Sequence, residues 1–199
     1  MTTQKKGLTV KDLVTTGIFT ALVFIFSQIG GIPFGMNPAT TFYLPIGAAI
    51  LSGPVYLLLI AKVPKRGPLT IVGIMLGIIE FILGMHWAMD LGLVLCGVVA
   101  DFVAGSQHYR SSKANIAAFA IQNLGYTGAY IVIFLNPQAW VENMVSSGNA
   151  TQSYADTMLS VATPTTMVIM FVGTIVMSAL SGWAGKKLMK KQFEKAGIL

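Results

Sequence analysis

A short stretch between two apolar runs holds the residues best suited to chemistry. Glu80 lies inside the first run, and His86, Trp87 and Asp90 follow at the turn into the second. Two carboxylates, an imidazole and an indole can hydrogen-bond a small polar molecule, and the carboxylates and the imidazole can also exchange protons with it. An ionisable residue inside an apolar run is costly, which makes Glu80 a functional candidate. The structural alternative is that Glu80 makes one hydrogen bond between helices, while His86 and Trp87 lie at the water interface.

Other polar and aromatic residues fall toward the same ends of the predicted helices. Asn123, Tyr126 and Tyr130 follow 3-4 spacing, which gives one polar-aromatic stripe on a helix. Asn37 lies in an uncharged segment rich in glycine and proline that can fold back over a cavity. We therefore expect a substrate-binding pocket that contains Asn37, Glu80, His86, Trp87, Asp90, Asn123, Tyr126 and Tyr130.

The composition indicates a membrane protein rather than a soluble one. Of the 199 residues, 54% are hydrophobic and 10% are charged, whereas soluble domains have about 25% charged residues. The mean hydropathy is +0.72. The net charge of +6 does not favour nucleic acid, because the basic residues lie between apolar runs. We expect an all-α, polytopic membrane protein with a single membrane domain over residues 1–199.

Six apolar runs predict six transmembrane helices. With this count, all 13 Lys and Arg residues fall on one side of the membrane. The positive-inside rule then places both termini in the cytoplasm, and we expect the plasma membrane of a bacterium. The predicted outer loops are 30–40 and 136–162. The predicted spans cover about residues 13–29, 41–61, 69–84, 88–104, 114–135 and 164–185.

Small residues recur at helical spacing and predict close contacts between helices. Gly73, Gly77 and Gly84 share a face with Glu80, where they let a neighbouring backbone approach. Gly17 and Ala21, four residues apart, form a second small-residue face near the basic end of the first span.

Several chemistries have no motif in the sequence. There is no GxxxxGK[ST] to bind ATP phosphates and no HExxH or Cys/His cluster, so we expect no cofactor. His86 and Asp90 supply two metal ligands where a site needs more, so no metal is expected either. No inverted repeat of the kind found in many secondary transporters is visible. The single cysteine excludes a disulfide framework.

Short segments along nearly the whole chain resemble a known family. They are LTVKDLVTTGIFTAL at 8–22, AKVPKRGPLTIVGIMLG at 61–77, GMHW at 84–87, GVVADFVA at 97–104 and the final FEKAGIL. The chain resembles the substrate-binding S components of energy-coupling factor (ECF) transporters, within them the Trep_Strep or MptD-like group.

The resemblance implies a fold, a ligand and partners. S components have six helices with both termini inside, and they bind a vitamin or similar small molecule in an outward cavity closed by the first loop. An AxxxA motif on the first helix docks on a membrane coupling subunit, which is driven by two cytoplasmic ATPases. Here the motif reads Gly17 to Ala21, and both positions stay small. Internal packing is the alternative role for this face.

These observations predict a substrate-binding subunit, with no enzymatic activity, of an ATP-driven vitamin importer. Trp87, Tyr126 and Tyr130 suit a flat ring, and the outer side lacks Lys and Arg. A neutral or cationic aromatic ligand is therefore favoured over a phosphorylated one. Two alternatives remain open. The first is a membrane enzyme that uses Glu80, His86 and Asp90 for acid–base chemistry, and the second is a structural membrane protein without a ligand.

Overall fold

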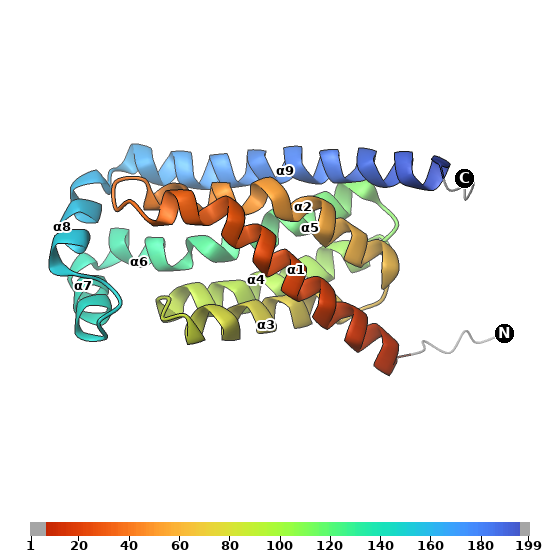
Figure 1. The fold of residues 1–199 in the computed structure, drawn as a ribbon, viewed down its shortest axis with the longest axis horizontal. Helices are drawn as coiled ribbons and strands as arrows, with labels where there is room; N and C mark the ends of the chain where they lie inside the picture. The colour runs from red at the N-terminus through yellow and green to blue at the C-terminus, as the bar shows by residue number, and fades with distance from the viewer. Residues whose placement is uncertain (1–6, 196–199) are drawn as a thin grey trace.

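Helices make up almost all of the chain between residues 7 and 195, which are the residues that the computed structural model describes (Figure 1). No strand occurs within this range, so the all-α prediction is confirmed. Two short 3-10 turns, η1 (Thr41–Tyr43) and η2 (Gly125–Thr127), precede α2 and α6. The helices are α1 (Val10–Gly35), α2 (Leu44–Lys62), α3 (Pro68–Ile82), α4 (Trp87–Ser106), α5 (Ser112–Leu124), α6 (Gly128–Leu135), α7 (Pro137–Ser146), α8 (Gln152–Val161) and α9 (Pro164–Lys195).

Five helical segments are long and apolar enough to cross a membrane. They are α1, α4, the η1–α2 segment Thr41–Lys62, the α5–α6 segment Ser112–Leu135, and Pro164–Leu188 of α9. The apolar helix α3 has 15 residues, or about 22 Å, against a hydrocarbon core of about 30 Å. Large apolar side chains such as Ile18, Leu95 and Val176 are exposed on the outside of the bundle. Such a surface is typical of contact with lipid.

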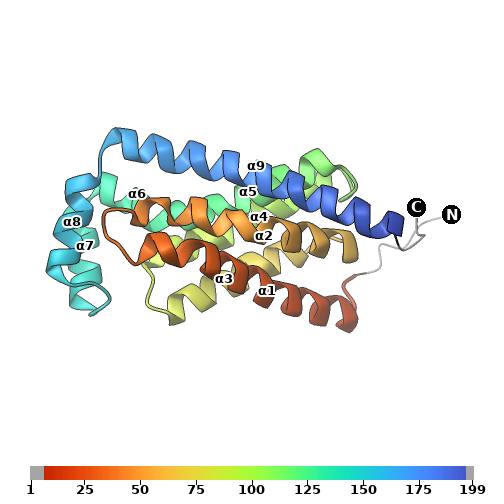
Figure 2. The same cartoon turned by 45° about the horizontal axis from the view of Figure 1, so that its top comes forward.

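The two ends of the bundle differ in charge. The start of α1, the end of α9 and the α2–α3 and α4–α5 connections lie at one end, which we call the basic end (Figure 1). The α1–α2 connection, the α3–α4 turn and the α7–α8 pair lie at the other, which we call the α7–α8 end (Figure 2). The Lys and Arg residues of the described range all belong to the basic end: Lys11, Lys62, Lys65, Arg66, Arg110, Lys113, Lys186, Lys187, Lys190, Lys191 and Lys195.

The first helix is longer than the sequence predicts. Instead of ending near residue 29, α1 continues across Pro33 to Gly35, so the predicted loop over 30–40 shrinks to residues 36–40. The backbones of Gly30 and Gly47 touch, and this tight packing on α2 supports the extension. The helical pattern of hydrogen bonds continues beyond Pro33, where the Met36 amide donates to the Ile32 carbonyl at 3.0 Å.

The predicted outer loop 136–162 is also corrected, because it folds into α7 and α8. Local capping explains both helices. Asn136 Oδ1 accepts a hydrogen bond from the Ala139 amide at 3.1 Å, and Pro137 occupies the first turn. Thr151 Oγ1 accepts from the Tyr154 amide at 3.2 Å.

The predicted span 164–185 extends to the end of α9, and the predicted span 114–135 is interrupted by η2.

The close contact predicted for the glycines of α3 is confirmed at two positions. A Cβ atom on Gly73 would lie 2.9 Å from the Gly97 Cα, and one on Gly77 would lie 2.8 Å from the Asp90 carbonyl oxygen. Gly84 differs from the prediction, because α3 has already ended at Ile82. Its φ of 81° instead lets the chain turn toward α4.

Candidate functional site

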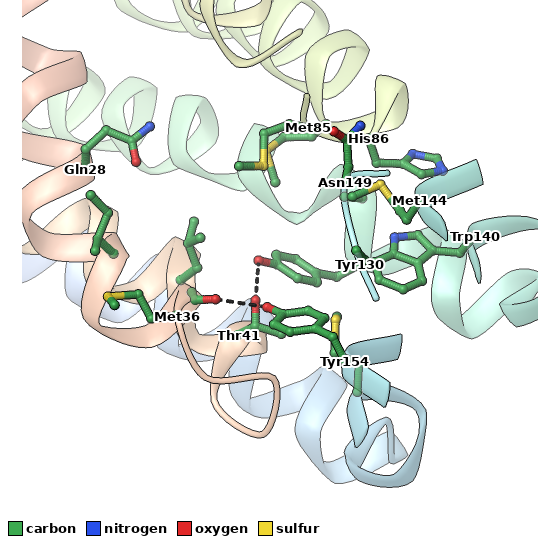
Figure 3. Close-up of a pocket in the computed structure, with 17 residues that line it drawn as sticks. Gln28, Met36, Thr41, Met85, His86, Tyr130, Trp140, Met144, Asn149 and Tyr154 are labelled. Atoms are coloured by element: carbon green, nitrogen blue, oxygen red, sulfur yellow. Dashed lines mark hydrogen bonds between the residues drawn. The ribbon is translucent and has the colours of Figure 1, made fainter. Parts of the chain in front are cut away.

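A cavity of about 370 Å³ lies at the α7–α8 end, between α1, η1, α4, α6 and the α7–α8 pair (Figure 3). This volume is within the range of about 300–1,000 Å³ of small-molecule sites. Among the described residues, no Asp, Glu, Lys or Arg lines it. Its polar and aromatic lining consists of Gln28, Thr41, His86, Tyr130, Trp140, Asn149 and Tyr154, and five methionines add soft apolar surface: Met36, Met85, Met89, Met144 and Met158.

The α7–α8 pair covers one side of the cavity. Trp140 and Met144 lie one turn apart on α7, and Tyr154 and Met158 lie one turn apart on α8. The Tyr154 hydroxyl donates a hydrogen bond of 2.9 Å to the Gly35 carbonyl (Figure 3). This bond joins α8 to the last residue of α1.

Two polar groups on the cavity wall already have partners. The hydroxyls of Tyr130 and Thr41 lie 3.2 Å apart and share a hydrogen bond. His86 Nδ1 accepts from the Ala88 amide at 3.2 Å and caps the start of α4. Burial lowers the pKa of His86 below its ordinary 6.5, so the ring is neutral at pH 7 with its proton on Nε2.

Trp140 differs from these groups. Its side chain is 3% exposed, and its buried Nε1 has no hydrogen-bond partner among the described residues. Figure 3 shows the indole ring reaching from α7 toward Tyr130. Because buried polar atoms are rarely left unpaired, this donor is a feature that a ligand can explain.

A second layer of polar groups lies behind the cavity wall. Gln28 lines the cavity, and its Nε2 donates to Glu80 Oε1 at 2.9 Å. Glu80 is 2% exposed and does not itself line the cavity. The side chains of Ser27 and Tyr126 are also buried. Gln28 is therefore the link between the cavity and the buried carboxylate.

The structure brings two of the eight predicted pocket residues, His86 and Tyr130, to this cavity, while Glu80 reaches it through Gln28. Asn37 lies elsewhere because the extension of α1 moved the connection. Its side chain is exposed, and its Oδ1 accepts from the Ala39 amide at 2.9 Å in a local turn.

Trp87 and Asp90 also differ from the prediction. His86 is the cap of α4, so Trp87 is the first helical residue and points to the outside, where it is 56% exposed. Trp87 and Asp90 line a surface groove between α3 and α4, together with Ile74 and Phe81. The close contact of α3 with α4 thus separates them from the cavity.

Asn123 and Tyr126 are buried inside the bundle and do not line the cavity. Asn123 Nδ2 donates to the Phe119 carbonyl within α5 at 3.1 Å. Both residues precede α6, the part of this predicted span that reaches the cavity with Tyr130.

The second small-residue face is open rather than packed. A Cβ atom on Gly17 would meet nothing within 4 Å, and Ala21 is exposed. Val14 and Ile18, on the same side of α1, are each 56% exposed. Internal packing therefore does not account for the small residues at these two positions.

Sequence reasoning missed the contribution of residues 136–162. It treated the segment as a loop, so Trp140, Asn149 and Tyr154 were not among the expected residues. The signals were present as helix caps at Asn136 and Thr151 followed by apolar pairs at i, i+4. Gln28 and Thr41 carry no comparable signal, because their role depends on the packing of α1 and η1.

The described residues contain no group of three or more His, Cys, Asp and Glu side chains that can hold a metal ion. The cavity lining offers hydrogen bonds, aromatic faces and thioethers to a ligand.

The apolar outer surface and the membrane-length helices define the class of this protein as an integral membrane protein. The family model Trep_Strep, described as a hypothetical bacterial integral membrane protein, matches residues 10–195, and the chain belongs to this family. No curated protein and no solved structure matches the chain.

Proposed function

We propose that the protein is the substrate-binding S component of an ATP-driven ECF-type importer. It binds a vitamin or a similar small metabolite and delivers it by docking on a transmembrane coupling subunit, which two cytoplasmic ATPase subunits drive. The observation that carries this proposal is the uncharged cavity at the α7–α8 end, opposite the basic residues. Its size and its mixture of aromatic and polar groups suit a small molecule.

The proposed topology has six spans with both termini in the cytoplasm. The collection of the described Lys and Arg residues at one end of the bundle supports it, because cytoplasmic connections carry such an excess. The sixth span would be α3, which is short, and a locally thinner bilayer or flanking residues can accommodate such a helix. In this orientation the cavity faces the outside of the cell.

The proposed docking surface is the open face of α1 around Gly17 and Ala21. Small residues let two membrane helices approach until their backbones pack, which supplies attraction where no hydrophobic drive exists. The lack of any neighbour within 4 Å of Gly17 supports a partner outside the chain.

Purification and reconstitution test this function. Native mass spectrometry of protein from its host membrane should show one retained small molecule of unchanged chemistry. Proteoliposomes should take this molecule up with ATP when the coupling subunit and ATPases are present, and not with this chain alone. Absence of both retention and uptake would refute the proposal. Turnover of the molecule by this chain alone would favour the enzyme alternative built on Glu80, His86 and Asp90.

A further inference from the structure

The cavity wall has few hydrogen-bonding groups left for a ligand. Tyr130 and Thr41 bond each other, and Tyr154 donates to the α1 backbone. Asn149 Nδ2 donates to Ser147 Oγ at 3.0 Å. Most of the polar lining is therefore committed to holding the cavity together.

The groups left for a ligand include the N–H donors of Trp140 and His86 and the side-chain amide oxygens of Gln28 and Asn149. Trp140 Nε1 has no partner in the described chain, and His86 carries its proton on Nε2 because Nδ1 caps α4. Gln28 donates its amide to Glu80, which leaves its side-chain oxygen as an acceptor. A ligand can complement these groups, and Trp140 is the one whose burial makes the missing bond costly.

The rest of the lining limits the charge and shape of the ligand. No ionised side chain of the described residues lines the cavity, so an ion would lose its hydration without a charged partner. The rings of Tyr130 and Trp140 offer flat faces. The five methionines adapt to a ring and make favourable sulfur–aromatic contacts.

We infer that the cavity takes an uncharged, planar heterocycle whose carbonyl or ring-nitrogen acceptor receives a hydrogen bond from Trp140 Nε1. This inference rests on the proposed function and narrows it, because it removes cations and anions from the possible substrates. It also assigns to α7 the residue that recognises the ligand, so α7 takes part in binding and does more than connect two spans.

The test begins with the molecule that wild-type protein retains when it is purified from its host. Extraction and mass spectrometry give its structure, and titration of the stripped protein with that compound gives its affinity. In a matched variant, Trp140 is replaced by benzothienylalanine, an isostere with sulfur in place of the N–H. We expect about tenfold weaker binding, the size of one lost hydrogen bond. Trp183→Phe on α9, where the ring is 52% exposed, is the control and should bind normally.

Each outcome decides a different point. A retained molecule that is charged at neutral pH would overturn the inference but leave the importer role intact. Unchanged affinity in the benzothienylalanine variant would have the same two consequences. Normal thermal stability of the variant excludes misfolding as the cause of weaker binding. No retained molecule together with no ATP-dependent uptake would overturn the proposed function and this inference with it.

Discussion

Gly17→Leu separates docking from folding and ligand binding. The new side chain meets no atom of the chain near its Cβ, and leucine is about 1 kcal/mol better than glycine inside a helix. The free energy of unfolding should therefore stay equal or rise slightly. Residues 17 and 28 lie eleven positions apart on one helix, or about 16 Å. Ligand affinity should therefore remain within about threefold of the wild-type value.

Docking should respond differently. A leucine inserted where two backbones pack forces the helices apart, and overpacking of this kind costs about 1–3 kcal/mol. The association with the coupling subunit should weaken by about 5- to 150-fold. The assay compares co-purification with the coupling subunit, ATP-dependent uptake in proteoliposomes and ligand affinity of the isolated protein, all on the same preparation.

Gly30→Leu is the matched control on the same helix. Its side chain would overlap the Gly47 carbonyl, so this variant should lose stability and ligand binding together with uptake. Normal uptake by Gly17→Leu would refute the docking role of the open face. Loss of ligand binding in Gly17→Leu would show instead that this position serves the internal structure.

Three further predictions concern the cavity. Gln28→Leu removes the donor to the buried Glu80 and should cost about 1–3 kcal/mol of stability, measured by thermal unfolding in detergent; an unchanged midpoint would contradict the link. Burial lowers the pKa of His86, so the unfolded chain binds a proton that the folded chain does not. The stability that neutral His86 contributes is complete above about pH 6.5 and falls as the pH is lowered. His86→Asn, which keeps a capping side chain, should therefore lose less thermal stability than wild type between pH 7 and pH 5, and parallel curves would exclude this role. Tyr154→Phe removes the bond to Gly35 and should speed hydrogen exchange in 137–161 about tenfold, with unchanged exchange in α4 as the internal control.

The fold class was predictable from the sequence because uncharged apolar runs of membrane length rarely occur in soluble proteins. The close approach of a neighbouring backbone to Gly73 and Gly77 was also predictable, since small residues at four-residue spacing let membrane helices pack closely, but the sequence did not name α4 as that neighbour. The residue at which α1 ends was not predictable from the sequence. Glycine and proline usually signal a loop, but the packing of Gly30 on Gly47 overrides that preference.

The cavity was harder to predict than the helices. At the start of a helix, a shift of one residue changes the face on which a side chain lies. Because His86 is the cap of α4, Trp87 lies on the outer surface. Trp140 comes from a segment distant in sequence from the α3–α4 turn. Its approach depends on how α7 packs beside α8 at one end of the bundle, which local spacing does not encode.

Because α1 continues without a break across Pro33, it can rotate as one rigid rod about its contact with α2. Its backbone packs against that of α2 at Gly30, thirteen residues from Gly17 and five from Gly35. At 1.5 Å per residue the two arms measure about 20 Å and about 8 Å. A rotation of α1 about this crossing that moves Gly17 by about 1 Å moves Gly35, with the carbonyl that Tyr154 holds, by about 0.4 Å in the opposite direction. A helix broken at residue 30 would transmit no such displacement.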